Sequence, residues 1–172
     1  ARAFADVSAL RTAYVFPGQG IQWKGMGMDG YERSMAARDV WDRAEAFTRG
    51  TLGFSLLDVV SNNPTRLRVG DEVHVHPEGV LNLTQFTQVA MATFAAAQVA
   101  ELRAEGAFDE TAVLAGHSIG EYNALAAIGG VLRFEATLGL VWARGTAMHH
   151  LVPRDDKGES KFRLGVIRPH LA

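Results

Sequence analysis

One serine of this 172-residue sequence stands in a pattern that could make it a nucleophile. The segment Gly116-His-Ser-Ile-Gly120 follows an apolar run and precedes a helical pattern. When a strand enters a helix through a single serine, the turn is tight and presents the hydroxyl at the carboxyl edge of the sheet. Only small residues fit two positions before and after that serine. The helix N-terminus also supplies free N–H groups, among them that of Ile119, for a developing oxyanion. An ordinary strand-to-helix loop is the alternative.

A second feature, Phe16-Pro-Gly-Gln-Gly20, comes directly after another apolar run, Ala13–Phe16. Its small, turn-forming residues let the loop approach a neighbouring site closely, and its amides are available as donors. Taken alone it is a generic turn. Together with the serine turn it indicates a site built from two loops.

The elements that must position these loops follow an alternation of strands and helices, which predicts an α/β architecture. Both Ala13–Phe16 and Thr111–Ala115 are predicted to be buried strands, and the glycine-rich loop is expected to run from Gly18 to Gly30. Helices are predicted at about 31–49 (closed by Gly50), around 55–60, from a capping box Asn82-Leu-Thr-Gln85 to about 105, from 119 to about 128, and at about 134–148. The long helix at 82–105 carries a core-facing stripe of Phe86, Ala90, Phe94 and Ala97, and a last strand is predicted at 162–167.

A hairpin is predicted between residues 66 and 76, with two possible registers. A two-residue Gly70-Asp71 loop would pair Val69 with Glu72 and mix apolar and charged side chains on one face. A three-residue loop would pair Val69 with Val73, and we prefer that register. His74 and His76 are expected to be exposed.

Composition narrows the class of protein. Lys and Arg total 17 against 19 Asp and Glu, a net charge of −2, so there is no basic stripe for nucleic acid. Cysteine is absent, which excludes disulfides, thiolate metal sites and a cysteine nucleophile. No His, Asp and Glu spacing suggests a metal, and the most apolar stretch, Val89 to Ala100, is too short to span a bilayer. We expect a cytoplasmic protein with no metal, nucleic-acid or membrane partner.

Four segments resemble the malonyl-CoA:acyl-carrier-protein transacylase family in order and spacing. They are Phe16-Pro-Gly-Gln-Gly20, Thr84-Gln-Phe-Thr-Gln88, Gly116-His-Ser-Ile-Gly-Glu-Tyr122 and Arg144-Gly145. Further segments are similar to the malonyl/palmitoyl transferase region of bacterial and fungal type I fatty acid synthases. They are Asn62-Asn-Pro64, Leu81-Asn-Leu-Thr-Gln85, Met148-His-His150 and Val152-Pro-Arg-Asp155.

The resemblance implies roles for individual residues. Ser118 corresponds to the nucleophile that accepts an acyl group from coenzyme A, and Gln19 and Ile119 to the two backbone N–H groups of the oxyanion hole. Arg144 corresponds to the residue that binds the malonyl carboxylate; by itself it would be taken for a surface arginine. A planar guanidinium suits a carboxylate because it can bind it bidentately. His117 is expected to point away from the Ser118 hydroxyl.

The resemblance also implies substrates, partners and domain boundaries. Coenzyme A thioesters and carrier-protein phosphopantetheine are the expected substrates, malonyl and possibly palmitoyl the groups moved, and no cofactor is expected. An acyl carrier protein domain and the rest of a fatty acid synthase, in a large homo-oligomer, are the expected partners. Residues 1–160 are expected to form an incomplete α/β-hydrolase-like three-layer core with a parallel sheet and a hairpin insertion near 66–76. Residues 161–172 would begin a ferredoxin-like subdomain.

The family's catalytic histidine is expected further downstream, so these 172 residues alone are predicted to be nearly inactive. His149, His150 and His170 do not stand at its position, and the first two are expected to cap helix carbonyls. Two other functions remain possible: a serine hydrolase or thioesterase with the same turn, and a non-catalytic segment of a large synthase. A carboxylate clamp at Arg144 would argue against a long-chain hydrolase.

Overall fold

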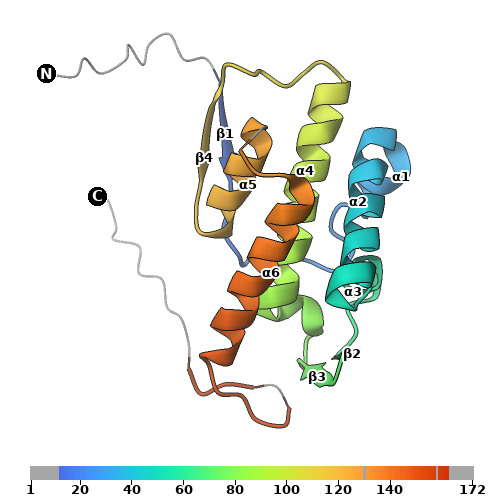
Figure 1. The fold of residues 1–172 in the computed structure, drawn as a ribbon, viewed down its shortest axis with the longest axis vertical. Coiled ribbons are helices and arrows are strands. Elements are labelled where there is room, and N and C mark those ends of the chain that lie inside the picture. The colour runs from blue at the N-terminus through green and yellow to red at the C-terminus, as the bar shows by residue number, and fades with distance from the viewer. Residues whose placement is uncertain (1–11, 130, 158, 163–172) are drawn as a thin grey trace, which may run out of the picture.

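The long helix α4 (Thr84–Ala104) lies at the centre of the fold, between α2 on one side and α5 and α6 on the other (Figure 1). The computed structural model describes residues 12–129, 131–157 and 159–162. The other elements are the strands β1 (Ala13–Phe16), β2 (Arg66–Val69), β3 (Glu72–Val75) and β4 (Val113–Gly116), and the helices α1 (Met28–Arg33), α2 (Met35–Phe47), α3 (Leu56–Asn62), α5 (Ile119–Ile128) and α6 (Phe134–His150). A π-helical turn (Thr48–Leu52) follows α2, and a 3₁₀ turn (Val80–Asn82) precedes α4.

Strands β1 and β4 pair in parallel, with Phe16 opposite Gly116. Side chains alternate along both strands: Tyr14, Phe16 and Leu114 face α4 and α5, whereas Val15 and Val113 are 73% and 42% exposed. Helices therefore cover one face of this sheet within the described residues. The prediction that both strands are buried is wrong for the opposite face. The mixed α/β arrangement with a parallel sheet is confirmed.

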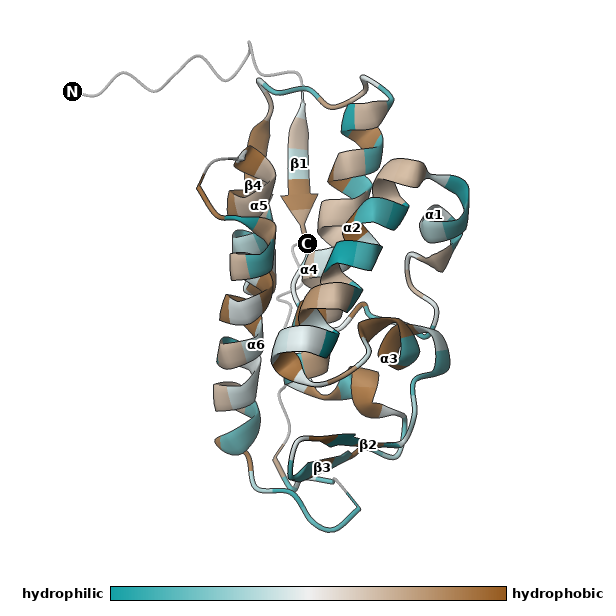
Figure 2. Cartoon of the chain, turned by 45° about the vertical axis from the view of Figure 1, so that its right-hand side comes forward, coloured by the Kyte–Doolittle hydropathy of each residue, from teal (hydrophilic) through white to brown (hydrophobic). Residues whose placement is uncertain are grey.

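The larger hydrophobic core lies among α2, α3, α4 and α6. Trp41, Phe86 and Leu138 are fully buried in it. Figure 2 shows the complementary pattern, with hydrophilic residues gathered on the outer turns of α1 and α2 and on the β2–β3 hairpin. The middle of α4 is buried on nearly all sides because α2 and α6 pack against opposite faces, so its predicted stripe is only part of its buried surface.

Several predicted boundaries shift, each for a local reason. The helix predicted at 31–49 is two helices, because Ser34 is extended and its hydroxyl caps α2 by accepting from the Ala37 N–H. The helical segment ends at Gly53, the residue with a left-handed φ of 82°, and not at Gly50. Since α1 begins at Met28, the glycine-rich loop also ends earlier than predicted, at Gly27.

Two further helix and strand starts differ. Asn82 does not cap α4, because the helix begins at Thr84 with Leu83 in the capping position and no side-chain cap. Strand β4 begins at Val113, because Thr111 is held in a turn by the Asp109 carboxylate. The helices α3, α5 and α6 agree with the prediction to within about two residues, and Ser55 caps α3.

The preferred hairpin register is wrong. Val69 pairs with Glu72 and Leu67 with His74 across a two-residue Gly70-Asp71 turn, in which Gly70 has a φ of 58°. The rejected register is stable because His74 is not an exposed polar residue: it is 8% exposed and packs against Phe86. Leu67 and His74 thus form one core-facing pair.

The last predicted strand, the proposed subdomain start and His170 lie outside the described residues, apart from Lys161 and Phe162, which have no regular structure. Among the described residues, no helix is both long and apolar enough to cross a bilayer.

Candidate active site

The backbone at Ser118 has the strained conformation expected of a nucleophile turn, with φ 57° and ψ −114°. Left-handed φ values are costly for a residue with a side chain, so the surrounding structure must hold this one in place. A Cβ atom on Gly116 would collide with the backbone of Gly120, and one on Gly120 would collide with the carbonyl of Phe16. The glycines on either side of the serine therefore have a steric reason, as the sequence pattern predicts.

The first glycine-rich loop lies directly against this turn. The His117 N–H donates to the Phe16 carbonyl at 3.1 Å. A Cβ on Gly18 would be 2.6 Å from Nδ1 of His117, so that ring lies over Gly18. Gln19 is the next residue along, and Ile119 begins α5, where an N–H has no acceptor within the helix. Two loops from distant parts of the chain thus meet at Ser118.

Arg144, on α6, reaches the serine. Its Nη2 donates to the Ser118 Oγ at 3.1 Å, and its Nη1 donates to Oε1 of Gln88 at 2.8 Å. The guanidinium carbon lies 5.5 Å from the centre of the Tyr122 ring. Its contacts in the described part of the chain are therefore with neutral groups, and no carboxylate there forms an ion pair with it.

The first turns of α4 support both loops and the arginine. Gly145 packs so closely on this helix that a Cβ would be 2.5 Å from the Cα of Gln85. Thr84 Oγ1 accepts from the side chain of Gln19 at 3.4 Å, and Gln88 lies one turn further along. Gln88 and Tyr122 were not among the predicted site residues. The signal that could have found Gln88 is a glutamine at a core position of a helix, since a buried amide needs partners.

None of the described histidines is hydrogen-bonded to the serine hydroxyl. In the described structure neither His149 nor His150 donates a ring hydrogen bond to a carbonyl of α6, and Nδ1 of His149 is buried without a partner. Burial, followed by the charge of Arg154, lowers the pKa of His149 to about 4. Burial also lowers the pKa of His74, whose ring is 6.1 Å from that of His149. These rings form a neutral cluster under the hairpin.

Charged and metal-binding chemistry is sparse near Ser118. Within the described ranges, no group of three or more His, Asp and Glu side chains is placed to hold a metal ion. What the site offers is a hydroxyl, two nearby loop backbones and a guanidinium without an anionic partner. This set suits attack on a carbonyl in a substrate that carries an anion.

Comparison with known proteins finds a matching family model and several similar proteins. A family model described as "Acyl transferase domain" matches residues 13–166. Fatty acid synthase subunit beta of Saccharomyces cerevisiae is 35% identical over 96% of this chain and 10% of its own length. The subunit of the same name from Schizosaccharomyces pombe is 33% identical over 96% of this chain and 10% of its own length. The chain thus spans about a tenth of these relatives.

Solved structures show a similar fold. The acyl-carrier-protein-S-malonyltransferase of Bartonella henselae superposes with a TM-score of 0.66 and 33% identity, over 82% of this chain and 40% of that one. The acyl carrier protein S-malonyltransferase of Vibrio cholerae gives a TM-score of 0.66 and 34% identity, over 83% of this chain and 40% of that one.

Proposed function

This chain belongs to the acyl transferase domain family, and on that premise we propose that it forms the nucleophile-bearing part of a malonyl transferase site in fatty acid synthesis. Ser118 is the nucleophile, the Gln19 and Ile119 amides form the oxyanion hole, and Arg144 binds the malonyl carboxylate. The relatives are fatty acid synthase subunits and malonyl transferases, which supports malonyl-CoA as the donor.

The single observation that carries the proposal is the contact between Arg144 and Ser118. A guanidinium 3.1 Å from a strained serine hydroxyl supports the assignment of a carboxylate-binding group next to the reacting atom. Because the described partners of Arg144 are neutral, its charge is free to pair with a substrate anion. A malonyl group carries a carboxylate two bonds from its thioester carbon, so one short substrate fits both residues.

In the first half-reaction, the Ser118 oxygen bonds to the thioester carbonyl carbon, and the hydroxyl proton passes to a base. The carbonyl oxygen becomes an oxyanion that the two backbone N–H groups stabilise. The carbon–sulfur bond then breaks, coenzyme A leaves as its thiol after protonation, and a malonyl ester remains on Ser118. The resemblance implies that this base is a histidine, and none of the described histidines is hydrogen-bonded to Ser118.

In the second half-reaction, the phosphopantetheine thiol of an acyl carrier protein attacks the ester and restores Ser118. One solved relative is a malonyl transacylase in complex with its acyl carrier protein, which supports this acceptor. Return of a palmitoyl chain to coenzyme A would use the same serine. Palmitoyl has no carboxylate, so Arg144 would keep its contact with Gln88 in that reaction.

The test is mass spectrometry of the full-length protein that carries this chain after exposure to malonyl-CoA. We expect a malonyl ester on Ser118, none in Ser118→Ala, and transfer of the ester to added carrier protein. In Arg144→Ala, malonyl loading should fall about tenfold to a hundredfold relative to loading from acetyl-CoA, because a charge-assisted hydrogen bond is lost.

An arginine exposed on the hairpin supplies the matched control: Arg68→Ala should leave both donors unchanged. Release of malonate to water without transfer to the carrier protein would make the site a hydrolase. Absence of any adduct would make the segment non-catalytic. Equal loss of both donors in Arg144→Ala would remove the carboxylate role of that residue alone.

A further inference from the structure

The backbone of Gln19, the proposed oxyanion donor of the first loop, lies in a segment that is intrinsically loose. Between the end of β1 and the start of α1 the chain runs from Pro17 to Gly27 without a helix or strand. Gly20, Gly25 and Gly27 in this segment all have positive φ. Glycine lowers the cost of such turns but leaves the chain many conformations. The direction of one N–H in this loop must therefore be set by contacts outside it.

One of these contacts lies on the N-terminal side of Gln19. Gly18 packs under the His117 ring, and the Phe16 carbonyl accepts the His117 N–H. These two contacts hold Gly18 in place, and Gly18 is the first residue of the peptide unit that carries the Gln19 N–H. A second anchor is needed to fix its rotation, because a peptide plane held at one end can still turn.

The second anchor is a relay of two side-chain amides. The Gly20 N–H donates to Oε1 of Gln22 at 2.9 Å, and Nε2 of Gln22 donates to Oδ1 of Asn82 at 3.2 Å. Nδ2 of Asn82 donates in turn to the carbonyls of Glu78 and Gly79 at 2.9 and 3.3 Å. Both amides are half-buried, and each uses its donor and its acceptor end.

The relay has a fixed direction. The two backbone carbonyls can only accept, so they require the NH₂ end of Asn82 and leave its oxygen toward Gln22. That oxygen requires the NH₂ end of Gln22, whose oxygen then receives the Gly20 N–H. Asn82, in the segment before α4, therefore sets the orientation of the peptide that follows Gln19. Thr84, two residues after Asn82, also contacts the Gln19 side chain.

We propose that Gln22 and Asn82 are positioning residues for the oxyanion hole: through Gly20 they hold the Gln19 N–H toward the Ser118 hydroxyl. This inference rests on the proposed function. Neither residue is hydrogen-bonded to Ser118 or Arg144 in the described structure, so we assign to them a role in positioning the loop and not in binding the donor. Their effect falls on the tetrahedral state, in which the oxyanion forms, and not on the bound thioester.

The experiment measures malonyl transfer by the full-length protein with Asn82→Ala, Gln22→Met and the double variant. We expect kcat to fall about tenfold to a hundredfold in each, because a misplaced oxyanion donor costs rate, while KM for malonyl-CoA changes less than about threefold. The double variant should be no slower than the worse single variant, because both residues act along one path.

Two controls separate this role from a general effect on folding. Asn62→Ala removes an exposed amide that, among the described residues, donates to Asp58 within α3, and it should leave kcat unchanged. Gln22→Met lies in a loop and has nearly the shape of glutamine, so it should keep the melting temperature even if Asn82→Ala lowers it. Gln22→Glu keeps the acceptor for Gly20 but sets a carboxylate oxygen against Oδ1 of Asn82, so it should not restore the rate.

The possible outcomes distinguish failure of the positioning role from failure of the proposed function. Unchanged kcat in folded Gln22→Met, or additive losses in the double variant, would overturn the positioning role while the proposed function stands. A rise in KM equal to the fall in kcat/KM would also overturn it, because the relay would then serve binding. If the unaltered protein forms no ester on Ser118, both this inference and the proposed function fail.

Discussion

Ser118 illustrates how a single residue is held in an unfavourable conformation by its neighbours. Its left-handed φ of 57° is kept by two glycines that allow the backbone of α5 to touch the end of β1. A Cβ atom added at either glycine would collide with backbone atoms, which cannot rotate away as a side chain can. The cost of the turn is therefore offset by the whole strand–helix junction and not by any one side chain.

At this scale we predict the effect of Gly120→Ala. The added methyl would overlap the Phe16 carbonyl, so α5 and β1 must separate. We expect a loss of about 1 to 3 kcal/mol in unfolding free energy and loss of the Ser118 ester with malonyl-CoA.

Gly50→Ala serves as the control, since a Cβ there meets open space. Urea denaturation and mass spectrometry give the two readouts. A Gly120→Ala protein that is as stable and as readily acylated as the original would show that the contact is not limiting.

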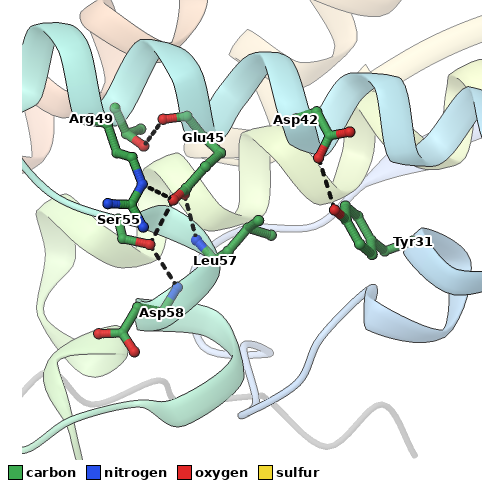
Figure 3. Close-up of polar contacts among 8 residues, drawn as sticks. Tyr31, Asp42, Glu45, Arg49, Ser55, Leu57 and Asp58 are labelled. Atoms are coloured by element: carbon green, nitrogen blue, oxygen red, sulfur yellow. Dashed lines mark hydrogen bonds and ion pairs between the residues drawn. The ribbon is translucent and has the colours of Figure 1, made fainter.

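At the scale of elements, the junction of α2 and α3 depends on one carboxylate. Glu45 of α2 accepts from the Ser55 hydroxyl at 2.7 Å and from the Leu57 N–H at 2.9 Å, and it pairs with Arg49 (Figure 3). Burial alone would raise the pKa of Glu45, but the hydrogen bonds from Leu57, Ser55 and Arg49 outweigh it and lower that pKa. The Glu45 carboxylate thus connects the N-terminus of α3 to α2 through hydrogen bonds.

A pH dependence follows from the lowered pKa of Glu45. The folded protein holds its proton less tightly than the unfolded chain, whose group titrates near 4.5. The carboxylate therefore stabilises the fold fully above about pH 4.5, and the effect is lost as pH falls through the lower folded pKa. Glu45→Gln should cost about 1 to 3 kcal/mol at pH 7.

Urea denaturation at pH 7 and pH 3 checks this prediction, with Asp39→Asn as the control because Asp39 is exposed and lies 3.9 Å from Arg43 on the same helix. The difference between Glu45→Gln and the unaltered protein should shrink at pH 3. A difference that stays constant with pH would mean that shape and not charge sets the contribution of Glu45.

At the scale of the whole molecule, the β2–β3 hairpin is attached to the helical core through a histidine. His74 packs on Phe86 and is hydrogen-bonded to Gln85, and its ring centre lies 6.1 Å from that of His149 on α6. Glu72, His150 and Arg154 supply the nearby charges. Both buried rings are neutral near pH 7, so the hairpin and α6 meet without unpaired buried charge.

Acidification should loosen this attachment. Burial lowers the pKa of His149 from 6.5 to about 4, so the unfolded chain binds a proton that the folded protein excludes. Stability is then complete above about pH 6.5 and declines as pH falls toward 4. The unfolding free energy should drop between pH 7 and pH 5, and His149→Gln should flatten that slope.

Equilibrium denaturation between pH 5 and pH 7 is the measurement, a range above that in which Glu45 titrates. His117→Gln, at an exposed ring, is the control and should keep the slope. An unchanged slope in His149→Gln would assign the acid sensitivity to another group.

The tight turn at Ser118 was predictable because its signals are local. The spacing of Gly116, Ser118 and Gly120 implies a tight strand-to-helix turn, and steric exclusion acts among neighbours in sequence. Residue types also set the Ser55 cap and the ends of α5 and α6 within about two residues. The resemblance singled out Arg144, which its own segment would not have distinguished from a surface arginine.

Tertiary structure decided what depends on contacts between distant segments. It placed Arg144 on Ser118 and Gln88, and connected Gln22 to Asn82 across the fold. It also selected the hairpin register by burying His74, which the sequence alone classes as polar. A side chain's type and spacing fix its local geometry, but its burial and charge state depend on which distant residues pack against it.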